Sequence, residues 1–217
     1  VIINYQGERT ILSYYPDAEG GFEVKDEVEP GWVYLTTAGK SYEAFYQEAV
    51  EWAKKSRAKI AFNPGSRQIK DGIEKNRFAY EAAEIIFINK EEAARLLHVN
   101  ANDASIKDLL SGMRGVGPKL VIITDGPDGA YSFDGNEYLF MPIVPGPVVE
   151  RTGAGDAFGS GFLAGIMQGL PVKEALRWGT CNSGSVLMYV GPQRGLLTKD
   201  QMVEWLKKSE EIKPREI

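Results

Sequence analysis

Short apolar segments alternate with amphipathic ones over most of this 217-residue chain, and the alternation limits the folds open to it. Lys59–Phe62, Ile85–Ile88 and Leu120–Thr124 are short apolar runs, which is typical of buried strands. Residues 42–53 and 154–169 instead repeat their apolar side chains at the spacing of a helix. Strands that alternate with helices predict a mostly parallel sheet covered on both faces, and therefore a three-layer α/β/α protein.

The first 36 residues differ from the rest because they show β patterning alone. We therefore expect residues 1–36 to form a separate small sheet and residues 37–217 to form the α/β core. The chain opens on strand-like residues and without Met, so we also expect it to be part of a longer protein. The expected strands are Val1–Ile3, Arg9–Tyr15, Phe22–Val24 and Trp32–Leu35, with a turn at Gln6-Gly7-Glu8.

Charge and composition argue against several classes of partner and site. The chain has 25 Lys and Arg against 30 Asp and Glu and no basic stripe, so we do not expect it to bind nucleic acid. Its longest apolar runs are far shorter than the ~20 residues that span a bilayer, so we expect no membrane contact. The single cysteine, Cys181, fits a reducing cytoplasm, and the single histidine, His98, excludes a multi-histidine metal site.

A glycine-rich stretch that runs into a helix carries the clearest chemical signal. Gly153 and Gly155 allow a tight turn and close approach of a ligand to the main chain. The first N–H groups of the helix lack partners and attract an anion such as phosphate. Asp156 stands beside this anion site, where a carboxylate could accept a proton from a hydroxyl that attacks phosphorus. On its own, the pattern is more often a helix start with an acid near the dipole.

Four further glycines follow in the same helix, and each lowers helix propensity. We therefore expect this helix to pack closely against a neighbour or a ligand. They are Gly159, Gly161, Gly165 and Gly169.

The run Thr152-Gly153-Ala154-Gly155-Asp156-Ala157-Phe158 resembles the C-terminal signature of the ribokinase-like, PfkB-type carbohydrate kinases. Asn89-Lys90-Glu91-Glu92 resembles the family's Asn-x-x-Glu motif, and residues 124–129 resemble its Thr-x-Gly-x-x-Gly segment. The resemblance covers essentially the whole chain. It implies a ribokinase-like α/β/α sandwich with a small β lid, to which residues 1–36 would belong.

For single residues, the resemblance implies a kinase site that uses ATP and Mg²⁺. Asp156 would be the catalytic base, beside an anion hole made of the N–H groups of Gly153, Ala154 and Gly155. Glu92 would hold Mg²⁺, in part through water. From the residues alone, the Asn-x-x-Glu motif is also a helix N-cap with its capping box, and both roles can coexist. The nucleotide would be bound by Asn89, Thr124, Gly126, Gly129 and Asn182.

The chain departs from the family pattern in two places. The family usually has Asp-Thr where this chain has Glu150-Arg151, and that Asp often helps to bind a monovalent cation. We therefore expect weak or absent activation by potassium, while Arg151 could either face the phosphates or point to solvent. The family's N-terminal strands, its Gly-Gly motif and the Asp that grips sugar hydroxyls have no counterpart here. We therefore expect the chain to be a C-terminal portion of a family member.

The expected reaction is transfer of the γ-phosphoryl group of ATP to a hydroxyl of a sugar or nucleoside. Asn63–Arg67 resembles a segment near the sugar in several family branches, but it does not distinguish ribose-, fructose- and nucleoside-type substrates. The alternative is a nucleotide-binding or regulatory module without turnover, which the missing substrate part favours. A homodimer through the lid or an exposed sheet edge is also left open.

Overall fold

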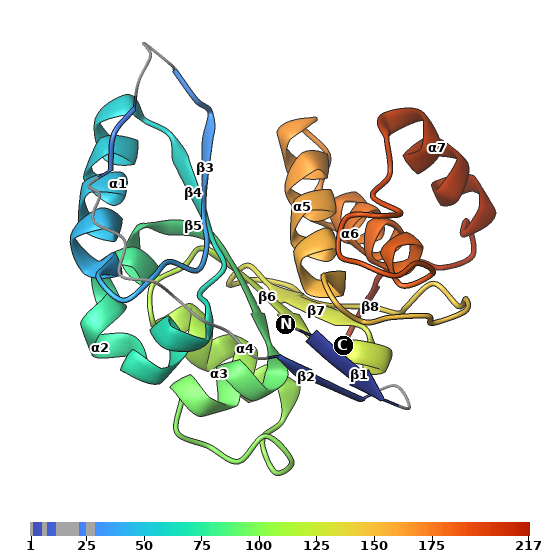
Figure 1. Cartoon of the computed structure of the whole chain (residues 1–217), viewed down its shortest axis with the longest axis horizontal. Coiled ribbons are helices and arrows are strands. Elements are labelled where there is room, and N and C mark those ends of the chain that lie inside the picture. The colour runs from blue at the N-terminus through green and yellow to red at the C-terminus, as the bar shows by residue number, and fades with distance from the viewer. Residues whose placement is uncertain (1, 6–7, 12–21, 25–28) are drawn as a thin grey trace. The chain divides into compact units, whose positions relative to one another are not determined.

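The computed structural model describes the backbone of residues 2–5 and 8–11 and the whole of residues 22–24 and 29–217. These residues fall into two compact units, which are described separately below (Figure 1). Unit 1 comprises residues 1–13, 124–131 and 139–217, and unit 2 comprises residues 14–123 and 132–138. Among the described residues, no helix is both long enough and apolar enough to cross a membrane.

Seven strands form the large sheet, in the order β3-β4-β5-β6-β7-β8-β9. The pairs β3/β4 and β4/β5 are parallel, with Val33 opposite Ile60, and β8/β9 is antiparallel. The expected α/β architecture with a mostly parallel sheet is therefore confirmed. The strands are β3 Trp32–Leu35, β4 Lys59–Phe62, β5 Ala83–Asn89, β6 Leu120–Thr124, β7 Ala130–Phe133, β8 Tyr138–Met141 and β9 Arg215–Glu216.

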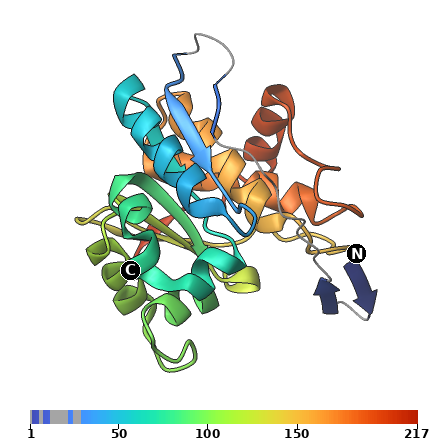
Figure 2. The same cartoon turned by 60° about the vertical axis from the view of Figure 1, so that its left-hand side comes forward.

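A second, two-stranded sheet pairs β1 (Ile2–Tyr5) with β2 (Glu8–Ile11) in antiparallel register, with Ile2 opposite Ile11 (Figure 2). This hairpin agrees with the β patterning of the opening segment, although its turn and residues 12–15 lie outside the described residues. Trp32–Leu35, which the sequence assigned to the small sheet, instead pairs with β4 in the large one. Residues 22–24 form no regular strand.

Unit 2 is built on the strands β3 to β6 and on four helices. Helix α1 buries Tyr42, Tyr46, Ala49 and Ala53, whose spacing of three and four residues places them on one face. The ring of Tyr46 meets that of Phe62 on β4 edge to face, which joins the helix to the sheet. The helices are α1 Tyr42–Ser56, α2 Ser66–Ala82, α3 Lys90–Leu96 and α4 Ile106–Gly115.

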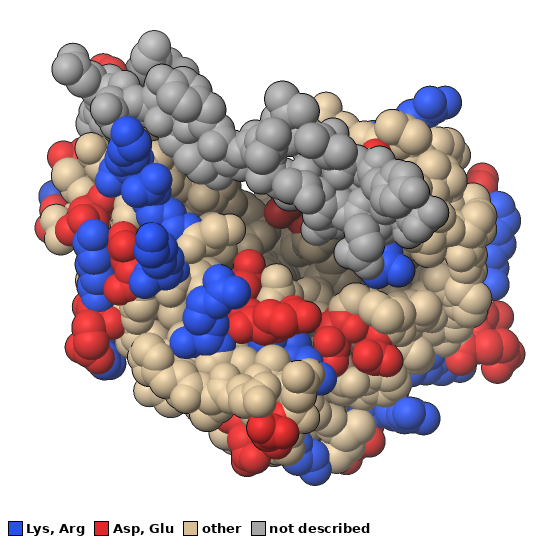
Figure 3. All heavy atoms as spheres, turned by 60° about the horizontal axis from the view of Figure 1, so that its bottom comes forward, with Lys and Arg blue, Asp and Glu red and all other residues tan. Residues whose placement is uncertain are grey.

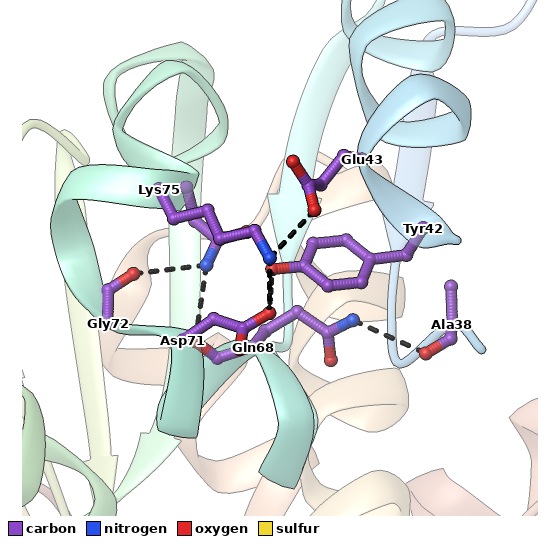
Figure 4. Close-up of polar contacts among 8 residues, drawn as sticks. Ala38, Tyr42, Glu43, Gln68, Asp71, Gly72 and Lys75 are labelled. Carbon is purple, nitrogen blue, oxygen red and sulfur yellow. Dashed lines mark hydrogen bonds and ion pairs between the residues drawn. The ribbon is translucent and has the colours of Figure 1, made fainter. Parts of the chain in front are cut away.

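A polar cluster joins α1 to α2 on unit 2 (Figure 4). The Tyr42 hydroxyl donates to Asp71 Oδ2 at 2.7 Å, and Lys75 bridges that carboxylate and Glu43 at 3.1 and 2.7 Å. Burial, together with this hydrogen bond, raises the pKa of Tyr42 to about 12, whereas the hydrogen bond lowers the pKa of Asp71. The cluster lies beside Gly72, where α2 is kinked.

Unit 1 carries three neighbouring helices, α5 (Ala154–Met167), α6 (Val172–Val186) and α7 (Lys199–Lys208) (Figure 1). A Cβ on Gly161 of α5 would lie 2.9 Å from the carbonyl oxygen of Trp178 on α6. On α6, a Cβ on Gly179 would lie equally close to the carbonyl oxygen of Phe158. The expected close packing of the glycine-rich helix is therefore confirmed, and its neighbour is α6. The prediction was wrong for Gly169, which lies beyond the end of α5 and has a φ of +79°.

Charged side chains of both signs are interspersed over the face drawn in Figure 3. The described residues include ion pairs, such as that of Lys119 with Glu84 at 2.9 Å. Pairs as exposed as this one contribute little to stability.

Candidate active site

The left-handed turn before α5 forms at Gly153, which has a φ of +80° and precedes the first helical residue. A Cβ at this position would lie 2.7 Å from Cα and 3.0 Å from the carbonyl oxygen of Pro192. Both the backbone conformation and the close approach of Pro192 therefore require glycine. The sequence predicted a tight turn here and a helix that begins at Ala154, and the structure confirms both.

Gly155 has a different reason to be glycine. It lies within the first turn of α5 and is not among the residues with positive φ, so the tight turn is made by Gly153 alone. A Cβ on Gly155 would meet no atom within 4 Å. The main chain is therefore open at this point, which suits an anion that must approach the backbone closely.

The groups predicted to handle phosphate lie around this helix start. Asp156 is exposed in the first turn of α5. The Ala154 N–H makes a 3.3 Å hydrogen bond to the carbonyl oxygen of Arg151, so this member of the predicted anion hole already has a weak local partner. The anion hole of Gly153, Ala154 and Gly155 and the basic role of Asp156 stay predictions.

The predicted nucleotide turn follows β6 and contains a short 3₁₀ helix at residues 126–128. Gly129 has a φ of +93°, and a Cβ there would collide with the carbonyl oxygen of Met141 on β8. Glycine at 129 is therefore needed by the fold itself. Gly126 also has a positive φ, of +51°, but it is exposed and has open space at its Cβ position, and Thr124 ends the strand. The nucleotide-binding roles of Thr124, Gly126 and Gly129 stay predictions.

The amide of Asn182 is used in hydrogen bonds within unit 1. Its Nδ2 donates to the carbonyl oxygen of Ala157 at 2.7 Å, and its Oδ1 accepts from the Leu197 N–H at 2.9 Å. Asn182 also borders a pocket of about 410 Å³ between α5, α6 and α7. The pocket does not contain the other predicted nucleotide residues of this unit, and the contact between Asn182 and the base stays a prediction.

In unit 2, Asn89 and Glu92 form the capping box of α3. The Glu92 N–H donates to Asn89 Oδ1 at 2.8 Å, and the Asn89 N–H donates to Glu92 Oε2 at 3.1 Å. Burial raises the pKa of Glu92 despite the hydrogen bond from Asn89. A nearby cation would offset this raised pKa, because it favours the charged carboxylate. In the part of the chain that the structure describes, no cluster of three or more His, Cys, Asp and Glu side chains could hold a metal.

Two residues before the glycine turn differ from their expected family counterparts. Glu150 Oε2 accepts a hydrogen bond from the Gly191 N–H at 2.9 Å, across 41 residues of sequence. Arg151 is exposed, and the side-chain oxygen of Thr152 is buried without a hydrogen-bond partner. The Glu150–Gly191 pair could not be predicted from the sequence, because no local pattern links positions so far apart.

The predicted site residues are therefore divided between the units. Unit 2 contains Asn89 and Glu92, whereas unit 1 contains the rest. Those in unit 1 are Thr124, Gly126, Gly129, Gly153, Ala154, Gly155, Asp156 and Asn182.

Known proteins are similar to this chain in sequence and in fold. The chain is 37% identical to a cytidine kinase of Thermococcus kodakarensis over 139 residues, which are 62% of this chain and 48% of that protein. A nucleoside kinase of Methanocaldococcus jannaschii, 26% identical, matches with a TM-score of 0.66 over 82% of this chain and 56% of that one. A ribokinase of Arabidopsis thaliana, solved with ribose and ATP, is 20% identical and has a TM-score of 0.73 over 82% and 56%.

These coverages mean that the chain spans about half the length of these relatives. At 20% identity, the likeness to ribokinase shows the fold alone. It confirms the ribokinase-like fold that was expected from the sequence. The model of the pfkB family of carbohydrate kinases matches residues 1–199. With the helix start, the capping box and the ribokinase fold in place, this match over most of the chain shows that the protein belongs to the pfkB carbohydrate kinase family.

Proposed function

We propose that this chain carries the phosphoryl-transfer machinery of an ATP-dependent sugar or nucleoside kinase. The observation that carries the proposal is the start of α5, where the open main chain at Gly155 lies beside the carboxylate-bearing residue Asp156. A helix N-terminus favours an anion, and its dipole needs no reorganisation as charge develops in the reaction. The relatives named as cytidine and nucleoside kinases support the same class of reaction.

In the proposed mechanism, Asp156 accepts the proton of the substrate hydroxyl as its oxygen attacks the γ-phosphorus of ATP. The N–H groups at the helix start stabilise the equatorial oxygens of the phosphoryl group in transfer. The leaving group is ADP. General-base catalysis of this kind contributes about 10²–10⁴-fold in rate.

The residues also suit ATP and Mg²⁺, the expected cosubstrate and cofactor. The capping box occupies only one oxygen of Glu92, and Mg²⁺ keeps several waters, so one carboxylate near the phosphates is sufficient. Bound Mg²⁺ would neutralise charge on the phosphates. In unit 2, Asn89 at the end of β5 and Glu92 in the first turn of α3 would contribute, and in unit 1, Thr124 at the end of β6 and Gly126 would contribute.

The class of substrate is a sugar or a nucleoside with a reactive hydroxyl. Because the chain spans about half the length of its relatives, activity on a particular sugar or nucleoside is part of the proposal. A cytoplasmic location and the homodimer also stay predictions.

The proposal is tested by Asp156→Asn, with Asp108→Asn as a matched control. Both residues are exposed acids at the third position of a helix, α5 and α4 respectively, so loss of charge near a helix dipole affects both alike. We expect Asp156→Asn alone to lose phosphoryl transfer by about 10²–10⁴-fold, with MgATP affinity little changed. The measurements are turnover over a panel of sugars and nucleosides and calorimetric titration with MgATP.

Near-normal turnover by the Asp156→Asn variant would remove the proposed base. MgATP binding without turnover by the unaltered protein, on any acceptor, would support the alternative of a nucleotide-binding or regulatory module.

A further inference from the structure

One loop, residues 187–197, packs against the start of α5 and the segment that precedes it. Pro192 of this loop lies against the Gly153 turn, close enough to exclude any side chain there. The loop is tied to the segment before the turn at two further points. The Val149 N–H donates to the carbonyl oxygen of Leu187 at 2.8 Å, and the Gly191 N–H donates to Glu150 Oε2 at 2.9 Å.

We propose that Glu150 is a positioning residue for the anion site, which acts by holding the Gly191–Pro192 segment against the Gly153 turn. The inference rests on the proposed function, because it gives the carboxylate a role in phosphoryl transfer without contact to the substrate. Glu150 fixes Gly191, the next residue Pro192 fixes Gly153, and Gly153 sets the direction of the first N–H groups of α5.

The other end of the loop is held by contacts that do not involve Glu150. There the Leu197 N–H donates to Asn182 Oδ1, and the same amide donates to Ala157 in the first turn of α5. Loss of the Glu150 contact would therefore release the Gly191 end and leave the Leu197 end in place. The side chain of the half-buried Glu150 is long enough to bring an oxygen to the Gly191 N–H, so its reach is what holds this end.

Reach and charge can be separated by three substitutions. Glu150→Gln keeps the length of the side chain and an oxygen that can accept from Gly191. Glu150→Asp keeps the charge but is shorter by one methylene, and Glu150→Ala removes both. Glu204→Ala, at an exposed position on α7, is the control for loss of a surface acid.

We expect Glu150→Ala and Glu150→Asp to lower kcat roughly 10–100-fold, because a shift of about 1 Å in a catalytic group can cost 10²-fold. The KM for MgATP should change little, Glu150→Gln should recover most of the rate, and Glu204→Ala should match the unaltered protein. Hydrogen exchange at the Gly191 amide, followed by NMR, should be slow in the unaltered protein and in Glu150→Gln and fast in the other two Glu150 variants. A thermal midpoint within about 4 °C of the unaltered protein would show that the variants fold.

The outcomes separate the two proposals. Unchanged kcat in Glu150→Ala, or unchanged protection of the Gly191 amide, would overturn the positioning role. An equal loss in Glu150→Gln would also contradict it, because reach alone would then not restore the site. If the unaltered protein transfers no phosphoryl group to any acceptor, the proposed function fails, and with it the catalytic part of this inference. The exchange rates would still decide whether Glu150 holds the loop.

Discussion

The two glycines at the start of α5 should respond in opposite ways to the same substitution. In Gly153→Ala, the new Cβ must occupy a φ of +80° and lies 2.7 Å from Cα of Pro192. The left-handed conformation costs roughly 1–2 kcal/mol and the overpacking roughly 1–3 kcal/mol, so we expect a loss of about 2–5 kcal/mol in the free energy of unfolding. For a chain of this size, the midpoint of thermal unfolding should fall by roughly 4–20 °C.

In Gly155→Ala, the new Cβ enters open space, and the helix gains a residue of higher propensity. We expect its stability to be unchanged or higher by up to about 1 kcal/mol. Its turnover and MgATP affinity should nevertheless fall, because the methyl group stands where the phosphate would approach the main chain.

Thermal unfolding, MgATP titration and turnover of the two variants are the assays. Equal melting of Gly153→Ala and the unaltered protein would show that the turn does not depend on a left-handed glycine beside Pro192. Full activity and affinity in Gly155→Ala would refute the approach of phosphate to this part of α5.

Three further predictions concern single side chains. Because burial raises the pKa of Glu92, its contribution to stability is present at low pH and lost as the pH rises through the raised pKa. Glu92→Gln should therefore have a melting midpoint no lower than that of the unaltered protein at pH 7, and its Mg²⁺-dependent activity should be weaker. A clear drop in its melting midpoint would contradict this. Because the pKa of Asp71 is lowered, its carboxylate stabilises the fold above the ordinary pKa of Asp, and this stability is lost as the pH falls. Tyr42→Phe should therefore lose about 1 kcal/mol in the free energy of unfolding at pH 7 but less at pH 3, as urea unfolding at both pH values would measure. Turnover should be similar in sodium and potassium buffers, because Glu150 is bonded to the Gly191 N–H, and strong activation by potassium alone would contradict this.

Much of the fold could be predicted from the sequence because local patterns determine it. The buried strands at 59–62 and 120–124 have the predicted bounds, since an apolar run of four or five residues between turn signals is typical of a covered strand and too short for most helices. Strand β3 was instead grouped with the opening β segment. Its sequence is also a short apolar run, and only the pairing with β4, which is a tertiary contact, places it in the large sheet.

In the candidate site, too, the local features could be predicted from the sequence and the long-range contacts could not. The start of α5 at Ala154 and the capping box of Asn89 and Glu92 follow from residues within a few positions of each other, and both are present in the structure. The contacts of Asn182 and Glu150 join positions 15 to 41 residues apart. Such contacts depend on how the elements pack, so neither could be predicted from spacing within the sequence.

The loop contacts also explain how a glycine-rich helix start can be both open and ordered. An anion site works without reorganisation only if its N–H groups already point at the ligand, yet glycine gives the main chain freedom to move. Here Pro192, Glu150 and Asn182 restrict that freedom from outside the helix, so the face at Gly155 can stay free of side chains. In the proposed mechanism, stability and catalysis are therefore coupled at Gly153, whereas Asp156 extends from a helix start that is already held. Substitutions at Gly153 should lower both properties together, and substitution of Asp156 should lower activity alone.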